Sequence, residues 1–181
     1  MSARWDGESP LILTDLVIRR VTKDDLPALE WDGAYTTYRR MYADLFRDSR
    51  TGRVILWMVA HPPGEMIGQT FVLLRSGQGK IADGSRRAYL FAIRVKPAWR
   101  NQGVGSYLIS FVESDLHQRG FRYATLNVSK DNFEAQRLYQ RLGYQVIGTS
   151  PGIWSYTDHE GHIQYVNEPA WRMMKTLKSP D

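Results

Sequence analysis

The feature of this sequence that most constrains its fold lies in its middle third. A nearly continuous apolar run, Ala88–Val95, is typical of a central strand covered on both faces. A short loop containing Gly103 and Gly105 follows, and apolar side chains then recur with a helical period as far as Arg119. Gly120 stands where a C-cap glycine belongs. The segment therefore predicts a strand, a glycine loop and a long amphipathic helix.

The glycine loop is typical of a phosphate-binding site. Two glycines at a strand-to-helix junction let the backbone approach a ligand, and the first N–H groups of the helix point outward with the positive end of the dipole behind them. Arg100 to Gly105 match the pattern Arg/Gln-x-x-Gly-x-Gly/Ala. A P-loop is excluded because no lysine follows Gly105, and a dinucleotide fingerprint is disfavoured by Leu108 at its third glycine. A second interpretation of the two glycines stays open: a turn that only lets the helix pack closely on the strand and binds no ligand.

The rest of the chain predicts an α/β (α+β) fold with a mixed central sheet of about six to seven strands and helices on both faces. Besides the central segment, strands are expected at 16–21, 54–60, 66–74, 122–128, 144–147 and 170–177, helices at 34–46 and 131–142, and a hairpin at 154–166. Residues 1–12 are expected to form a loose N-terminal arm, and residues 13–178 a single domain.

Composition excludes several classes of function. The chain has 181 residues, 43% of them apolar, and no apolar run approaches the ~20 residues of a membrane span. The N-terminus lacks the apolar region of a signal peptide. Because there is no cysteine, disulfides and thiolate zinc sites are excluded, and a cytoplasmic protein without a metal is expected. The net charge of +5 is scattered, which suits a polyanionic cofactor better than nucleic acid.

A second group of residues lies downstream of the glycine loop. Asn132 and Tyr139 are seven residues apart, about two helical turns, so both lie on one stripe of the helix expected there. Local explanations compete with a binding role. Asn132 is itself a good N-cap, and Asp131 with Glu134 can form a capping box. Tyr139, beside Leu138, can equally be an ordinary core tyrosine.

Together these residues resemble the GCN5-related N-acetyltransferase (GNAT) superfamily. The likeness runs from about Leu90 to Ile147, and the last strand, near 168–175, resembles that of such enzymes less specifically. It rests on Ile93-Arg94-Val95-Lys96-Pro97, the loop Arg100 to Gly105, the helix Asn132-x-x-Ala135-x-x-x-Tyr139, and Leu142-Gly143-Tyr144.

The resemblance implies acetyl-CoA as the donor of an acetyl group to a primary amine, by direct attack in a ternary complex. Main-chain amides from Gln102 to Ser106 would hold the pyrophosphate, and the sheet would splay beside a strand edge that pairs with the pantetheine. Tyr139 would act as the catalytic acid near the sulfur. The cofactor-binding residues implied are Ile93, Arg94, Val95, Arg100, Gln102, Gly103, Val104, Gly105, Ser106 and Asn132.

Neither the general base nor the acceptor is evident from the sequence. The strand from Tyr89 to Val95 carries no carboxylate, although some relatives place a glutamate there. An ordered water near Asn127 and Ser129 would serve as a base, and the side-chain candidates are Glu30, Asp32, His159, His162 and Glu168. A group of aromatic residues suits either the core or the wall of an acceptor pocket: Trp31, Tyr35, Tyr38, Tyr42, Trp154 and Tyr156.

The expected partner is a small-molecule amine or a peptide amine, with neither nucleic acid nor a membrane involved. Pairing of two copies through the C-terminal strands is an interaction that the resemblance allows. A non-catalytic domain that binds or senses acyl-CoA is the main alternative, because no base is visible. A nucleotide-binding protein is the third.

Overall fold

The chain folds around one mixed seven-stranded sheet. The computed structural model describes residues 12–77 and 81–178, and the sheet has the strand order β1-β2-β3-β4-β5-β9-β6. Its strands are β1 Val17–Arg20, β2 Val54–His61, β3 Glu65–Leu73, β4 Arg87–Val95, β5 Tyr123–Ser129, β6 Gln145–Ser150 and β9 Ala170–Thr176. A separate hairpin pairs β7 Ile153–Thr157 with β8 Ile163–Asn167. The predicted fold class is confirmed; residues 1–11 of the expected arm lie outside the described residues.

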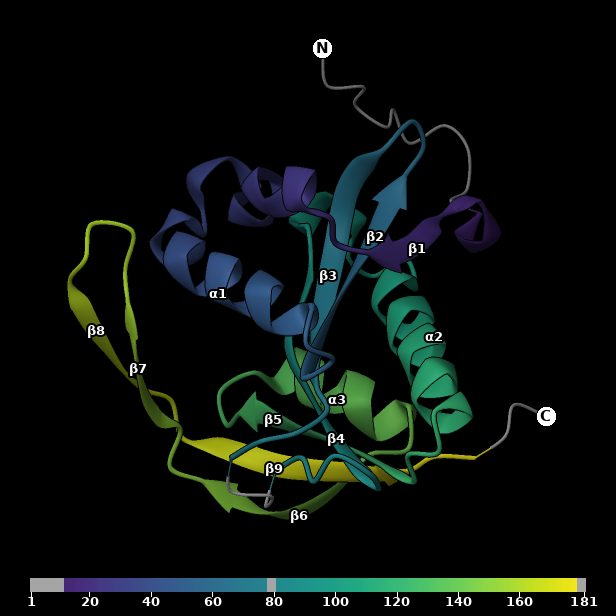
Figure 1. The fold of residues 1–181 in the computed structure, drawn as a ribbon. Helices are drawn as coiled ribbons and strands as arrows, with labels where there is room; N and C mark the ends of the chain where they lie inside the picture. Colours follow the sequence, from purple (N-terminus) through teal and green to yellow (C-terminus); the bar gives the residue numbers. More distant parts are fainter. Residues whose placement is uncertain (1–11, 78–80, 179–181) are drawn as a thin grey trace.

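Helices cover both faces of the sheet (Figure 1). On one face, α2 Val104–Gln118 packs on the sheet through a fully buried stripe that includes Leu108, Val112 and Leu116, and α3 Phe133–Arg141 joins the same core through Tyr139. These α2 side chains recur every four residues, as the helical period of the sequence predicts. On the other face, α1 Arg39–Ser49 packs against β2 and β3 through the buried Tyr42.

The sheet splays apart between β4 and β5. These strands form the parallel pair of the sheet, and their pairing ends at Leu90 and Leu126. Beyond that point β4 stays paired with β3 as far as Val95, while β5 stays paired with β9. Among the described residues no strand covers the other edge of β4 from Phe91 to Val95. The expected splay is therefore confirmed.

A bulge in β4 marks the point where the splay begins. The register between β3 and β4 shifts between Gln69 and Phe71, and Ala92 takes a left-handed φ of 50°. This conformation costs an alanine of order 1–3 kcal/mol, so the surrounding structure must hold it. Gly68 on β3 gives the bulged strand room, because a Cβ there would lie 2.8 Å from the Arg94 carbonyl oxygen. The bulge turns the strand's backbone groups relative to those of β5.

The first helix begins later than the sequence predicts. The expected helix at 34–46 is wrong for its first turn: α1 starts at Arg39, and η3 Thr36–Tyr38 precedes it as a 3₁₀ turn. Before it, Trp31 and Asp32 take left-handed φ values of 47° and 56° within η2 Lys23–Gly33. The stripe of tyrosines suits both helix types because side chains three residues apart share a face in each.

The β7–β8 hairpin extends away from the sheet and leans against α1 and the residues before it (Figure 1). The Tyr156 hydroxyl lies 3.0 Å from the Thr37 hydroxyl, and the Tyr38 ring packs on those of Trp154 and Tyr156 at 6.4 and 4.8 Å. Residues more than 110 positions apart thus form one wall of the molecule.

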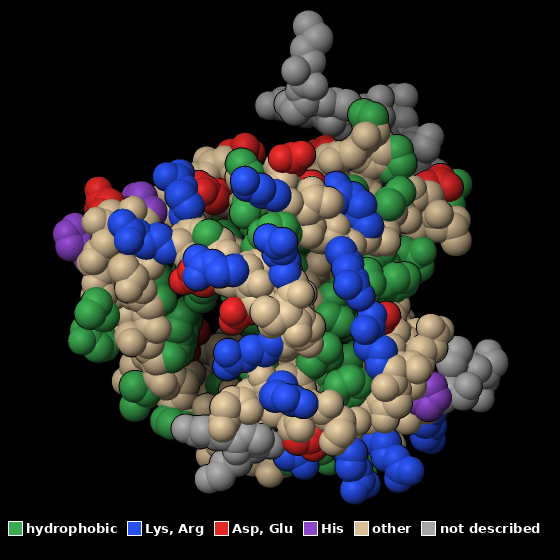
Figure 2. All heavy atoms as spheres, in the orientation of Figure 1, with side chains coloured by type: hydrophobic (Ala, Val, Ile, Leu, Met, Phe, Trp, Pro, Cys, Tyr) green, Lys and Arg blue, Asp and Glu red, His purple; other side chains and the backbone are tan. Residues whose placement is uncertain are grey.

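Charge is spread over the surface. Figure 2 shows Lys and Arg side chains over much of the visible face, with acidic side chains between them. This matches the scattered basic residues of the sequence. In the part of the chain that the structure describes, no helix combines the length and the apolar character needed to span a membrane.

Candidate active site

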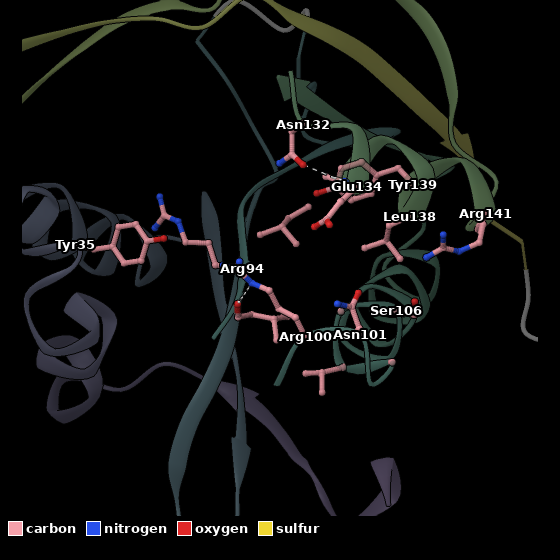
Figure 3. Close-up of a pocket in the computed structure, with 16 residues that line it drawn as sticks. Tyr35, Arg94, Arg100, Asn101, Ser106, Asn132, Glu134, Leu138, Tyr139 and Arg141 are labelled. Atoms are coloured by element: carbon pink, nitrogen blue, oxygen red, sulfur yellow. Dashed lines mark hydrogen bonds between the residues drawn. The ribbon is translucent and has the colours of Figure 1, made fainter. Parts of the chain in front are cut away.

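A cavity of about 660 Å³ opens where β4 and β5 separate (Figure 3). It lies between the open edge of β4, the N-terminus of α2 and the first turns of α3. All but one of the predicted site residues line it, the exception being Gln102. Its lining comprises Tyr35, Ile93, Arg94, Val95, Arg100, Asn101, Gly103, Val104, Gly105, Ser106, Asn132, Glu134, Ala135, Leu138, Tyr139 and Arg141.

The N-terminus of α2 presents uncapped main-chain N–H groups to this cavity. Gly103 is the N-cap residue, with φ of 84°, a conformation that glycine adopts without strain. The amides of the first turn of a helix have no intrahelical acceptor, and here no side chain caps them. Gly105 brings three elements together, because a Cβ there would lie 3.6 Å from Leu138 on α3 and 3.8 Å from Val95 on β4. The arrangement can bind an anion.

The charges around the cavity are mostly positive. Arg100 donates from Nε to the Val95 carbonyl over 2.9 Å, which anchors the side chain beside the end of β4. Arg141 approaches from the α3 side and has no ion-pair partner among the described residues (Figure 3). Glu134 is the acidic residue in the lining. The Gln102 side chain instead turns back to donate to the Ala98 carbonyl over 3.0 Å, which leaves its main chain as the group able to reach a ligand.

Tyr139 combines the features of a core residue and of a site residue. It is only 6% exposed, and its ring lies 6.0 Å from that of Tyr144 in an edge-to-face contact. Its hydroxyl has no hydrogen-bond partner among the described residues, although the residue lines the cavity. Burial raises the pKa of Tyr139 to about 12, with a smaller contribution from Tyr89. The phenol is therefore protonated at neutral pH and has an unused donor.

Asn132 is the N-cap of α3. Its Oδ1 accepts a hydrogen bond from the Ala135 amide over 3.1 Å, so the local role predicted for it is present. The cap residue is Asn132 rather than Asp131, which removes the capping box considered for Asp131 and Glu134. The amide nitrogen of the same side chain makes no hydrogen bond to the described residues, and the residue lines the cavity.

Two substitutions separate these roles of Asn132. We expect Asn132→Ala to destabilise the protein by about 1 kcal/mol through the lost cap, and Asn132→Asp to keep the stability because aspartate caps equally well. If the amide nitrogen contacts acetyl-CoA, both variants bind it more weakly. Thermal melting and calorimetric titration measure the two effects. An aspartate variant that binds acetyl-CoA as tightly as the wild type would reduce Asn132 to a cap.

The aromatic residues form one cluster that is part core and part surface. Tyr42 is 1% exposed and belongs to the core, whereas Tyr35, Tyr38 and Tyr156 are half-buried and Trp154 is 39% exposed. Tyr38 contacts the rings of Tyr35, Tyr42, Trp154 and Tyr156. Burial raises the pKa of Tyr38, so its hydroxyl stays protonated at neutral pH. Tyr42 is therefore a core residue, and the acceptor-pocket wall stays a prediction for the half-buried and exposed members.

The base candidates differ in their surroundings. Glu30 is held by Arg39 at 2.6 and 2.9 Å, and this contact lowers its pKa. Asp32 lies at the left-handed kink before α1. The Glu168 carboxylate has no hydrogen bond or ion pair among the described residues, and its charge acts on the Tyr38 hydroxyl. Of the five candidates, it therefore combines an unpaired carboxylate with a position beside the aromatic cluster.

The two histidines belong to the hairpin turn. His162, with Asp158 and Glu160, has ligand atoms within 4.8 Å of one another, whereas His159 is not part of that group. Asp158 already accepts hydrogen bonds from the amides of Glu160 and His162 and from the Gln164 side chain. The group is therefore explained as a turn whose central carboxylate organises the backbone.

The sequence analysis missed some of the cavity lining. Asn101, Ala135 and Leu138 stand inside or beside the matched motifs, so their spacing could have indicated them. Arg141 lies about one turn beyond Leu138 and is a further residue that helical spacing could have found. Tyr35, which the sequence suggested only for the core or an acceptor pocket, enters the cavity from a segment more than 50 residues upstream of β4, and no local signal connects it with the glycine loop.

Comparison with solved structures defines the class of fold. Ard1 from Thermoplasma volcanium superposes with a TM-score of 0.69 at 19% identity, over 91% of this chain and 99% of that one. NAA60 of Arabidopsis thaliana, in complex with acetyl-CoA, gives a TM-score of 0.65 at 18% identity, over 90% and 98% of the two chains. The chain therefore has the N-acetyltransferase fold.

The family follows from the sequence. The profile of the acetyltransferase (GNAT) family matches residues 19–144, more than half of the chain, and the chain belongs to this family. The predicted resemblance is confirmed. Among curated proteins, the streptothricin acetyltransferase of Streptomyces lavendulae is 28% identical over 86 residues. That match spans 47% of this chain and 46% of the relative, so about half the length of the relative is compared.

Proposed function

We propose that this protein transfers the acetyl group of acetyl-CoA to a primary amine, by direct attack in a ternary complex within one domain of residues 13–178. The observation that supports it most strongly is the cavity itself: an uncapped helix N-terminus and an open strand edge meet there with Tyr139. Family membership supports acetyl transfer, and the residues present fit a long, flexible thioester with a diphosphate.

In this proposal, different walls of the cavity bind different parts of acetyl-CoA. The main-chain amides from Gln102 to Ser106 bind the diphosphate, assisted by Arg100 and Arg141. The open edge of β4, residues 93–95, pairs with the pantetheine as an added strand would. Because Arg100 already binds the Val95 carbonyl, the remaining outward groups of this edge make that pairing. Asn132 offers its free amide nitrogen from the opposite wall.

The chain's own residues then assist the transfer. Acetyl-CoA supplies an activated carbonyl carbon and a good leaving group. The acceptor must be deprotonated to attack, since a free amine has a pKa of ~10, and Glu168 or a water at the splay takes that proton. Main-chain amides near Val95 stabilise the charge that develops on the carbonyl oxygen. Tyr139 donates a hydrogen bond to the sulfur as its bond to carbon breaks.

A thermal-shift panel followed by a thiol-release assay tests this function. A ligand at about 100 times its Kd that binds only the folded state stabilises by about 2.7 kcal/mol. For a chain of this size that is roughly 5–10 °C in Tm. We expect acetyl-CoA and CoA to give such a shift, and ATP and NAD to give none. We then expect thiol release when an amine is added.

The alternatives predict different results. Stabilisation by ATP or NAD instead of CoA would favour a nucleotide-binding protein. Tight binding of acetyl-CoA without thiol release on any amine would favour a domain that senses acyl-CoA. Either result would overturn the proposed transfer reaction.

A further inference from the structure

The main chain of Arg94 lies at the open edge of β4, and its side chain lies on the face of the sheet that α1 covers. Ile93 and Val95 pack toward the core under α2 and α3, and their main chain forms the open edge at the cavity. Arg94 lies between them and points to the opposite face, where its Nη1 donates to the Tyr42 hydroxyl over 3.0 Å. The guanidinium therefore lies on the α1 side of the segment that we propose pairs with the pantetheine.

This guanidinium has aromatic neighbours but no counterion. Its carbon lies 4.1 Å from the centre of the Tyr35 ring and 5.4 Å from that of Tyr38. Within residues 12–77 and 81–178 no carboxylate forms an ion pair with it. Cation–π contacts offset only part of the cost of partly burying a charge. Of its five N–H donors, one is used by Tyr42, so the others can bind a ligand.

Two acidic residues of η2 are already paired. Glu30 binds Arg39, and Asp25 binds Arg19 through two hydrogen bonds. The Glu168 carboxylate makes no hydrogen bond or ion pair among the described residues, and its charge acts on Tyr38. The surface is hollowed between the β7–β8 hairpin, at the left of Figure 2, and the centre of that face. The hairpin carries Tyr156, which packs on the Tyr38 ring.

We propose that the acceptor is an amine that also carries a carboxylate, and that Arg94 binds this carboxylate. The inference rests on the proposed function and names the class of its acceptor: free amino acids. Arg94 belongs to the segment whose open edge we propose pairs with the pantetheine. In this proposal one amino acid spans the edge of β4, with its amine at the acetyl group and its carboxylate at the guanidinium. A guanidinium binds a carboxylate through two parallel hydrogen bonds, and it repels a polycationic amine.

The test compares amines that differ only in the carboxylate. Phenylalanine, phenylalaninamide and phenethylamine form one set, and lysine, lysinamide and cadaverine another. With acetyl-CoA saturating, we expect kcat/KM by thiol release to be at least tenfold higher for each acid than for its amide. Arg94→Gln should reduce this preference by about 10- to 100-fold, the range expected for hydrogen bonds to a charged group. Arg94→Lys should restore part of it.

The preference for acid over amide separates recognition from a general structural effect, which would lower both rates alike. Arg40→Gln is the matched control, because it removes an exposed positive charge from α1 outside the cavity lining and should keep the preference. Thermal melting of Arg94→Gln checks that it folds. Equal use of acids, amides and amines by the wild type, or an unchanged preference in Arg94→Gln, would overturn the inference.

A binding measurement keeps this inference distinct from the transfer reaction. Calorimetric titration of phenylalanine and phenylalaninamide into the complex with CoA needs no turnover. Selective binding of the acid that is lost in Arg94→Gln would support the role of Arg94, even if thiol release failed and overturned the proposed reaction. Binding without selectivity would overturn the role of Arg94, even if thiol release succeeded.

Discussion

Replacing Tyr139 with phenylalanine is expected to lower kcat about 100-fold, within the range for loss of a positioned acid. That factor corresponds to about 2.7 kcal/mol in the barrier. The Kd for acetyl-CoA is expected to change little, because the ring and its contact with Tyr144 remain. Steady-state kinetics and calorimetric titration measure the two quantities. Unchanged turnover would remove Tyr139 from the mechanism.

The raised pKa of Tyr139 decides how it assists. A thiol has a pKa of ~8.5. At about 12, the phenol holds its proton more tightly than the departing thiolate would. We therefore propose that Tyr139 stabilises the sulfur chiefly by donating a hydrogen bond. Since its folded pKa lies above the ordinary value of 10, ionisation of Tyr139 should not lower the rate until the pH passes well above 10.

Tyr144→Phe is the matched control for this experiment. Tyr144 is equally buried and packs on Tyr139, but it is not among the residues that line the cavity. Burial raises its pKa well above the ordinary value, with a smaller contribution from Glu113. Removal of this hydroxyl should leave kcat within a few-fold of the wild type. An equal loss in both variants would point to a general effect on packing.

Replacing Gly105 with aspartate is expected to weaken acetyl-CoA binding at least 100-fold. The carboxylate would stand in the first turn of α2, where we propose that the diphosphate binds. At about 5 Å and an effective dielectric constant of ~20, two unit charges repel by on the order of 3 kcal/mol. The same substitution favours the folded helix, because a negative charge near a helix N-terminus is stabilising. Affinity and stability should therefore move in opposite directions.

Gly105→Ala is its neutral counterpart. The added Cβ would make ordinary van der Waals contacts with Leu138 and Val95 at 3.6 and 3.8 Å. It should bind acetyl-CoA with an affinity close to that of the wild type and gain up to about 1 kcal/mol of helix stability. Thermal melting and calorimetric titration of both variants complete the comparison. Normal binding by the aspartate variant would show that the diphosphate lies elsewhere.

The parts of the site that sequence could predict are local ones. Gly103 is a clear case: a glycine before a strongly periodic apolar stripe predicts a helix that begins there, and the structure has Gly103 as the N-cap of α2. The spacing of Asn132 and Tyr139 places both on one stripe in the same way, and both line the cavity. Each of these predictions depends on residues within two helical turns.

Other features fell outside such local patterns. The Gln102 side chain turns away because Ala98, four residues back, offers a carbonyl in the loop as it folds. The first turn of α1 is lost because the left-handed Trp31 and Asp32 redirect the chain. Aspartate tolerates that conformation, but tryptophan rarely adopts it, so the sequence does not indicate the kink. The sequence pattern is consistent with two roles for Asn132, helix capping and ligand binding, and cannot separate them. The structure shows the capping hydrogen bond directly.

By itself, the sequence determined most of the strands and helices, the glycine loop at the start of α2 and the family, because periodicity and short spacings are properties of neighbouring residues. Only the tertiary structure decided that β4 separates from β5 beyond Leu90, that Ala92 bulges, that Arg94 packs on Tyr35, and that the β7–β8 hairpin packs on Tyr38. These features depend on contacts between residues tens to more than a hundred positions apart. The free energy of such contacts depends on packing across the whole fold, so it cannot be predicted from any short segment of the sequence.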